Sequence, residues 1–238
     1  MSRVSTRPNL VEVKSINART YNLTTNHFIL FDLDGTLTDP KIGITRCIAY
    51  ALESLGLPVP PTEYLTSWIG PPIQDSFGEY LGDPDQANRA VSKFRERFAE
   101  KGIFENSVYD GIPKALAKLR DNGSTLILAT SKPQPFAERI LHHFDLNQYF
   151  AAVYGSQFDG SLSNKADLIA QILTTERINP TNAIMVGDRK HDVLGAAQNA
   201  VPCIGVLYGY GSQKELQEAG AAAYCENPPD LPLAVAGV

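Results

Sequence analysis

Two aspartates separated by one residue follow the first strongly apolar run of the chain. Asp32 and Asp34 come directly after Phe28–Phe31, and Gly35 follows them. In open α/β sheets, ligands bind at the carboxyl ends of the strands. Two like charges so close together either raise a pKa or recruit a cation, and magnesium prefers oxygen ligands. The pattern therefore indicates a magnesium site. The alternative is a β-hairpin, because Asp-Gly after an apolar run is a good hairpin signal.

A second acidic motif follows another apolar run. Ala183–Val186 is followed by Gly187, by Asp188 and, one helical turn later, by Asp192. A strand again delivers a carboxylate at its carboxyl end, where ligands bind. The alternative is structural: Asp188 would cap a helix N-terminus, and Asp192 would be a favourable acid in its first turn.

Hydroxyl and ammonium groups stand at two further positions. Thr130 and Ser131 end the apolar run that begins at Thr125. A hydroxyl there can hydrogen-bond a phosphoryl oxygen, or it can cap the following helix. Lys165 opens a predicted helix, where a cation is disfavoured by about 0.3–1 kcal/mol unless an anion binds beside it. Lys132 is a competing candidate for this cationic role, and a solvated surface lysine is the alternative for Lys165.

Strands and helices alternate along most of the chain. Short apolar runs predict buried strands, and apolar residues at i, i+3, i+4 and i+7 predict helices between them. The predicted strands are 28–31, 125–129, 152–154, 183–186, 203–207 and 222–224, and the predicted helices are 112–121, 134–144, 165–176 and 190–200. This order predicts an α/β fold, with a parallel sheet covered by helices on both faces. All the motifs above would then lie on one edge of the sheet.

Residues 42–107 interrupt this alternation. They contain no apolar run typical of a strand, and the segments 45–55, 63–69, 73–81 and 85–101 have helical patterns. We expect 42–107 to be an all-helical cap, inserted into a core formed by 27–41 and 108–238. Residues 1–26 are rich in hydroxyl and basic side chains. We expect them to be an N-terminal extension, with an organelle transit peptide as the minor alternative.

Composition and charge argue against several classes of protein. The 238 residues include 21 Lys plus Arg against 26 Asp plus Glu, a net charge of −5. Nucleic acids and anionic membranes attract a surplus of positive charge, so we expect neither as a partner. No apolar run approaches the ~18 residues that cross a bilayer. The three cysteines form no C-x-x-C pair, which favours a reducing compartment, and we expect a cytoplasmic protein.

Taken together, the motifs resemble those of the haloacid dehalogenase-like superfamily of phosphohydrolases. The resemblance covers about residues 28–226 and depends on two motifs, D-L-D-G-T-L-T-D from Asp32 and V-G-D-x-x-x-D from Val186. The helical insert and Tyr208–Gly211 are similar to members with a helical cap, such as phosphoglycolate phosphatases and related nucleotidases and sugar phosphatases. The resemblance implies a Rossmann-like catalytic core and a magnesium-dependent phosphatase of small phosphorylated metabolites.

The resemblance also implies the catalytic roles. Asp32 is the nucleophile, which forms an aspartyl phosphate, and Asp34 is the general acid and then the general base. The Asp32 carboxylate, the main-chain carbonyl of Asp34 and Asp188 hold the magnesium ion.

The same resemblance implies how a small-molecule phosphomonoester is bound. Thr130, with Ser131 beside it, and Lys165 hold the phosphoryl oxygens, and Asp192 orients Lys165 or a metal-bound water. We expect specificity to lie in the cap. Arg46, early in the first predicted cap helix, is a candidate to reach a second anionic group of the substrate, and the alternative is a solvated arginine.

Two other functions stay open at this stage. A phosphomutase on the same scaffold would return the phosphoryl group to a second hydroxyl instead of to water. A non-catalytic module would bind a metal or a phosphoprotein through the same residues. Phosphoglycolate, nucleoside monophosphates and sugar phosphates all suit a small helical cap, and no sequence signal fixes the oligomeric state.

Overall fold

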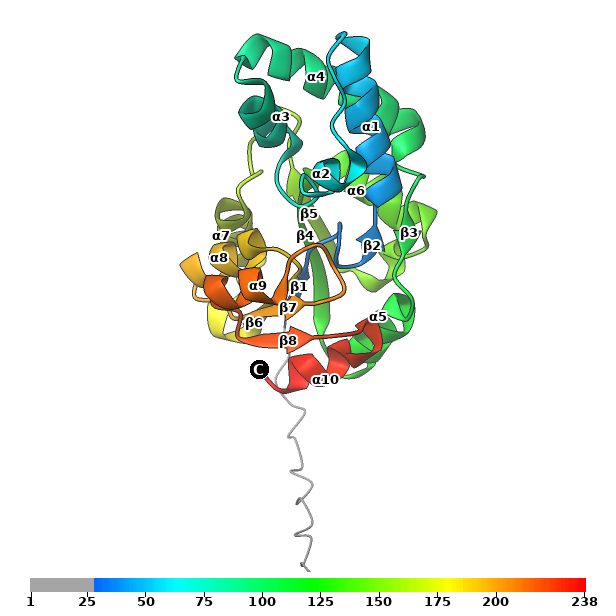
Figure 1. Ribbon diagram of the computed structural model, residues 1–238. Coiled ribbons are helices and arrows are strands. Elements are labelled where there is room, and N and C mark those ends of the chain that lie inside the picture. The colour runs from blue at the N-terminus through cyan, green and yellow to red at the C-terminus, as the bar shows by residue number, and fades with distance from the viewer. Residues whose placement is uncertain (1–27) are drawn as a thin grey trace, which may run out of the picture.

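A six-stranded parallel sheet forms the centre of the molecule (Figure 1). The computed structural model describes residues 28–238, so the expectation for residues 1–26 lies outside the described part. The strand order is β5-β4-β1-β6-β7-β8, and every neighbouring pair is parallel. The strands are β1 (Phe28–Phe31), β4 (Thr125–Pro133), β5 (Ala152–Ser156), β6 (Ala183–Gly187), β7 (Cys203–Val206) and β8 (Ala223–Cys225). The predicted α/β fold class is confirmed.

Side chains that alternate along each strand enter two separate cores. In β1, Ile29 and Phe31 pack into the first core and Leu30 packs into the second, all fully buried. This two-sided burial explains why the central strands are continuous apolar runs. The first face is covered by α5 (Ile112–Asp121), α6 (Gln134–His143) and α10 (Leu231–Ala236), and the second by α7 (Lys165–Thr175), α8 (Lys190–Gln198) and α9 (Gln213–Ala219).

Four helices gather above the sheet in Figure 1. They are α1 (Lys41–Ser54), α2 (Thr62–Thr66), α3 (Ile73–Leu81) and α4 (Pro84–Arg97), and α4 continues into a π-helical turn, η1 (Phe98–Gly102). Their apolar sides pack on one another through residues such as Ile48, Phe77 and Phe94. We propose that this group is the cap expected over 42–107.

The segment after Asp34 forms a turn and not a hairpin with β1. Thr38–Asp39 (β2) pairs antiparallel with Ser107–Val108 (β3), so a short two-stranded ribbon lies where the chain enters and leaves the helical group. β3 begins one residue inside the block 42–107, in which we expected no strand. Two residues form too short a strand to give an alternation pattern in the sequence.

Across residues 28–238, none of the helices combines the length and the apolarity needed to cross a membrane. This agrees with the hydropathy of the sequence.

Because the core has two sides, two leucine substitutions should lower the free energy of unfolding by very different amounts. Leu30→Ala removes a fully buried side chain from the middle of β1, and we expect it to lower the free energy of unfolding by about 2–5 kcal/mol. Leu233→Ala, at a leucine that is 72% exposed, should change it by less than ~0.5 kcal/mol. Urea unfolding followed by circular dichroism measures both. Equal losses in the two variants would contradict this assignment of the core.

Candidate active site

The predicted site residues come from four different strand or helix ends and meet at one edge of the sheet. Asp32 directly follows β1, Asp188 directly follows β6, and Lys165 is the first residue of α7. Thr130 lies near the end of β4, where the pairing with β5 becomes irregular between Thr130 and Pro133. The site is therefore a product of parallel topology, which aligns the carboxyl ends of strands that are distant in the sequence.

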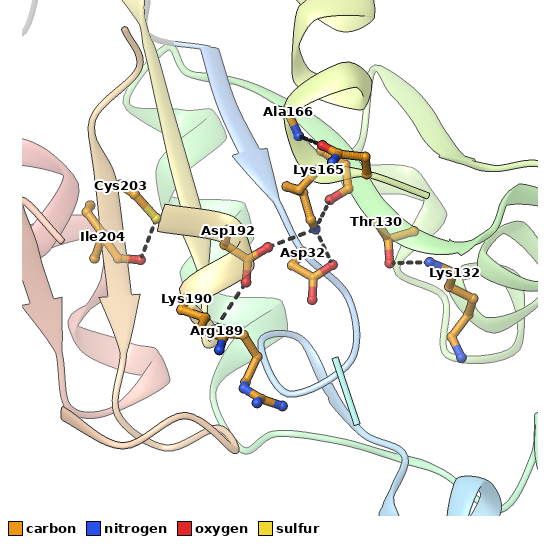
Figure 2. Close-up of polar contacts among 12 residues, drawn as sticks. Asp32, Thr130, Lys132, Lys165, Ala166, Arg189, Lys190, Asp192, Cys203 and Ile204 are labelled. Atoms are coloured by element: carbon orange, nitrogen blue, oxygen red, sulfur yellow. Dashed lines mark hydrogen bonds and ion pairs between the residues drawn. The ribbon is translucent and has the colours of Figure 1, made fainter. Parts of the chain in front are cut away.

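Lys165 occupies the centre of the cluster (Figure 2). Its Nζ lies 2.9 Å from Asp32 Oδ1 and 2.8 Å from Asp192 Oδ1, and it also donates to the carbonyl oxygen of Ala129 at 2.9 Å. Only 4% of the Lys165 side chain is exposed. Burial opposes the charged form of this lysine, but Asp192 and Asp32 outweigh that effect and raise its pKa. Lys165 is therefore a buried ammonium ion, not a solvated surface lysine.

The start of α7 explains how a lysine is tolerated there. Asn164 is the N-cap, and its side chain accepts a hydrogen bond from the N–H of Ala166 at 2.8 Å. The cap satisfies the helix end, so the Lys165 side chain is free to turn toward the carboxylates. A lysine at a helix N-terminus is expected to have an anion beside it, and these carboxylates are that anion.

Three carboxylates could together hold a cation. Asp32, Asp188 and Asp192 are buried and offer oxygen atoms that all lie within 4.8 Å of one another. Burial, followed by the charges of Asp192 and Asp32, raises the pKa of Asp188 well above its usual value. Oδ1 of Asp188 and Oδ1 of Asp34 are buried without a hydrogen-bond partner among residues 28–238. Because magnesium prefers oxygen ligands, this donor set fits a magnesium ion.

Backbone segments that contain glycine pack closely against Asp188. A Cβ atom on Gly35, which has φ of +88°, would lie 2.2 Å from Asp188 Oδ2, and a Cβ atom on Gly209 would lie 2.3 Å from Asp188 Cβ. The N–H of Tyr210 donates to Asp188 Oδ2 at 2.8 Å. The Tyr208–Gly211 segment therefore forms part of the site, because only residues without a side chain can approach the carboxylate so closely.

Lys132 pairs with the second aspartate of the D-L-D motif. Its Nζ lies 2.7 Å from Asp34 Oδ2 and 4.4 Å from the centre of the Phe98 ring. Burial raises the pKa of Asp34, and Lys132 opposes this shift. The two lysines that competed for one cationic role thus occupy different places: Lys165 is beside Asp32, and Lys132 is beside Asp34.

Asp192 and Arg189 connect the cluster to its surroundings. Asp192 Oδ2 accepts a hydrogen bond from the N–H of Arg189 at 3.1 Å, which closes the first turn of α8. The Arg189 guanidinium pairs with Glu215 at 2.9 Å and donates to the carbonyl oxygen of Ile69 in the helical group. Asp192 is held from two sides, by Arg189 and by Lys165.

The remaining predicted residues divide into two groups. Thr130 and Ser131 line a chamber of about 70 Å³ that also contains Asp32 and Asp34. Arg46 does not reach this chamber, because its side chain is 62% exposed and pairs with Glu105 at 2.7 Å.

Sequence reasoning missed several residues between 68 and 98 that line the chamber. Trp68, Phe94, Arg95 and Phe98 all contribute to its wall. Trp68 follows the end of α2, and the other three lie on a regular amphipathic helix or its π-helical end and carry no local signal.

Comparison with known proteins bears on this site. A family model described as haloacid dehalogenase-like hydrolase matches residues 29–206. A 5'-nucleotidase of Pseudomonas aeruginosa is 48% identical over 198 residues, covering 83% of this chain and 90% of that protein. The tyrosine-protein kinase PtkA of Mycobacterium tuberculosis is 41% identical over 183 residues, covering 77% of this chain and 62% of the kinase.

A solved structure agrees in both sequence and fold. The crystal structure of a predicted phosphatase from Clostridium acetobutylicum has a TM-score of 0.87 and 43% sequence identity, covering 90% of this chain and all of that one. The family model spans well over half of the chain, and it includes the motifs that begin at Asp32 and Val186. The resemblance inferred from those motifs is confirmed, and the chain belongs to the haloacid dehalogenase-like hydrolases.

Proposed function

We propose that this hydrolase is a magnesium-dependent phosphatase of small phosphorylated metabolites that acts through an aspartyl phosphate. The observation that carries the proposal is the arrangement around Asp32: a carboxylate at a strand end, a buried lysine at 2.9 Å and two further acids within 4.8 Å. Similarity to a 5'-nucleotidase, an enzyme that acts on phosphomonoesters, supports the same reaction class.

In the first step, an Asp32 carboxylate oxygen attacks the phosphorus atom of the bound phosphomonoester. A bond forms between this oxygen and phosphorus, and the bond from phosphorus to the alcohol oxygen breaks. Asp34 donates its proton to the departing alcohol oxygen. Burial raises the pKa of Asp34, which favours the protonated form that this step needs.

In the second step, a water molecule attacks the phosphorus of the aspartyl phosphate. Asp34, now deprotonated, takes a proton from this water, and the bond from phosphorus to Asp32 breaks to release inorganic phosphate. Lys132, 2.7 Å from Asp34, stabilises the carboxylate form of Asp34 between the two steps. Splitting one displacement into two lowers each barrier.

Positive charge must accompany the substrate, because a phosphate dianion and Asp32 repel each other. Lys165 would supply one positive charge, and the hydroxyl of Thr130, which lines the chamber beside Asp32, would bind a non-bridging oxygen. Asp32, Asp188 and the main-chain carbonyl of Asp34 would hold the magnesium ion, with Asp192 fixing Lys165 at 2.8 Å. When bound, magnesium shields the nucleophile and stabilises the charge of the transition state.

Removal of the nucleophile tests the proposal directly. Asp32→Asn should lower phosphate release from a phosphomonoester by at least ~1000-fold, because the amide is a poor nucleophile. The fold should persist, since the amide keeps the size of the side chain. Phosphate release and circular dichroism measure the two effects. Asp121→Asn, at an exposed aspartate at the end of α5, is the matched control and should keep full activity. Retained turnover by Asp32→Asn would refute the nucleophile assignment.

Metal binding should be measurable without activity. Magnesium at ~100 times its Kd should stabilise the folded protein by about 2.7 kcal/mol, because it binds a carboxylate cluster that the unfolded chain lacks. Thermal unfolding with magnesium and with a chelator measures this shift. Asp188→Asn should reduce the shift, and phosphate release should stop in chelator and return when magnesium is restored. An equal shift in both proteins would exclude Asp188 as a ligand.

The buried acids also predict how the stability of the metal-free protein depends on pH. Burial and its acidic neighbours raise the pKa of Asp188 above 3.8 in the folded state. The folded protein therefore holds a proton that the unfolded chain releases, so the free energy of unfolding should fall as the pH rises from about 4. Asp188→Asn removes this titration and should make the decline shallower. Urea unfolding in chelator between pH 4.5 and 7.5 measures it, and an unchanged slope in Asp188→Asn would contradict the pKa assignment.

A further inference from the structure

The chamber above Asp32 and Asp34 has an apolar wall and two basic side chains. Its wall consists mainly of aromatic and aliphatic residues: Ile44, Trp68, Ile73, Phe94, Phe98 and Phe136. The basic residues are Lys132, from the end of β4, and Arg95, from the last turn of α4. The chamber shares Trp68 and Ser131 with a wider cleft of about 570 Å³. Asp34, the proposed proton donor to the leaving alcohol, also lines this chamber.

The other cations near the nucleophile already have carboxylate partners. Lys132 pairs with Asp34, and Lys165 pairs with Asp32 and Asp192. Arg95 is different, because no carboxylate of residues 28–238 lies within 4 Å of its guanidinium. Arg95 is thus the cation of the chamber that a ligand can still neutralise.

The contacts of Arg95 with Phe158 use only one of the five N–H donors of its guanidinium. Its NH1 group donates to the carbonyl oxygen of Phe158 at 2.9 Å, and its guanidinium carbon lies 5.2 Å from the centre of the Phe158 ring. The Nε atom is buried and has no hydrogen-bond partner among the described residues. Apart from the bond to Phe158, the guanidinium N–H groups donate to no residue of 28–238, so they can donate to a ligand in the chamber that Arg95 lines.

We infer that Arg95 is a specificity-determining residue that donates a hydrogen bond to an oxygen acceptor on the leaving alcohol. The inference rests on the proposed phosphatase function and adds the substrate class: a phosphomonoester whose alcohol carries a carboxylate or a ring carbonyl. Planar guanidinium groups suit both kinds of oxygen. The Phe158 contact keeps the guanidinium rigid, which lowers the entropy cost of binding.

Two matched pairs of substrates test this assignment. 2-Phosphoglycolate and ethyl phosphate differ in having a carboxylate or a methyl group, and uridine 5'-monophosphate and ribose 5-phosphate differ in the base and its carbonyls. In Arg95→Met, kcat/KM for an acceptor-bearing substrate should fall by about 10- to 100-fold, the effect of one hydrogen bond to a charged group. The values for ethyl phosphate and ribose 5-phosphate should stay within about twofold. Arg95→Lys keeps the charge but lacks the planar guanidinium with its several N–H donors, and it should not restore the preference.

The chemical group that accepts the hydrogen bond is identified by the substrate pair in which Arg95→Met lowers kcat/KM. A loss confined to 2-phosphoglycolate assigns a carboxylate, and a loss confined to uridine 5'-monophosphate assigns a ring carbonyl. Arg89→Met is the matched control, because Arg89 is an exposed arginine on the same helix and lines none of the chamber. It should leave all four values unchanged.

The remaining outcomes overturn the inference. Equal losses on all four substrates would mean that Arg95 acts only structurally, through Phe158 and the loop before Lys165. No loss on any of them would mean that it does not contact the leaving group. If the wild-type protein releases phosphate from none of the four, the proposed function itself fails. If it hydrolyses only ethyl phosphate and ribose 5-phosphate, the function stands and the role of Arg95 is wrong.

Discussion

The site depends on one buried ammonium group. Lys165 places a positive charge between Asp32 and Asp192 where almost no water reaches it. Burial and neighbouring acids raise the pKa of Asp188 and of Asp192, and the charge of Lys165 opposes this shift at Asp192. The same ammonium group lies 2.9 Å from Asp32, the nucleophile of the proposed mechanism. The parallel sheet serves this arrangement by bringing strand ends from distant parts of the chain to one lysine.

The two aspartates of the D-L-D motif have different surroundings, which suits different chemical tasks. Asp32 lies beside Lys165 and the other carboxylates, whereas Asp34 lies beside Lys132 at the floor of the chamber. In the proposed mechanism, these surroundings suit Asp32 as the nucleophile and Asp34 as the proton donor. Surroundings that make the pKa values of two neighbouring carboxyl groups differ are a general way to assign them different roles in acid–base chemistry.

The sequence was sufficient to predict the parallel sheet and the strand-end residues, because both follow from local periodicity. Asp188 could be placed opposite Asp32 since parallel strands share a carboxyl edge. The periodicity of the sequence could not predict the partners of the charged side chains, because these depend on tertiary contacts. Lys132 turns to Asp34 at an irregular strand end, and Arg46 turns away to Glu105, 59 residues distant. Contacts of this kind form only when the helical group packs over the core, so the sequence alone does not predict them.

The contact between the helical group and the core uses main-chain acceptors to a large extent. Arg189 donates to the carbonyl oxygen of Ile69, Arg139 to that of Ala99, and Arg95 to that of Phe158. A carbonyl oxygen is present whatever side chain its residue carries. These three hydrogen bonds therefore do not depend on which side chain the acceptor residue carries. None of the three acceptor residues lines the chamber, so residues of its wall other than Arg95 can vary without removing these hydrogen bonds.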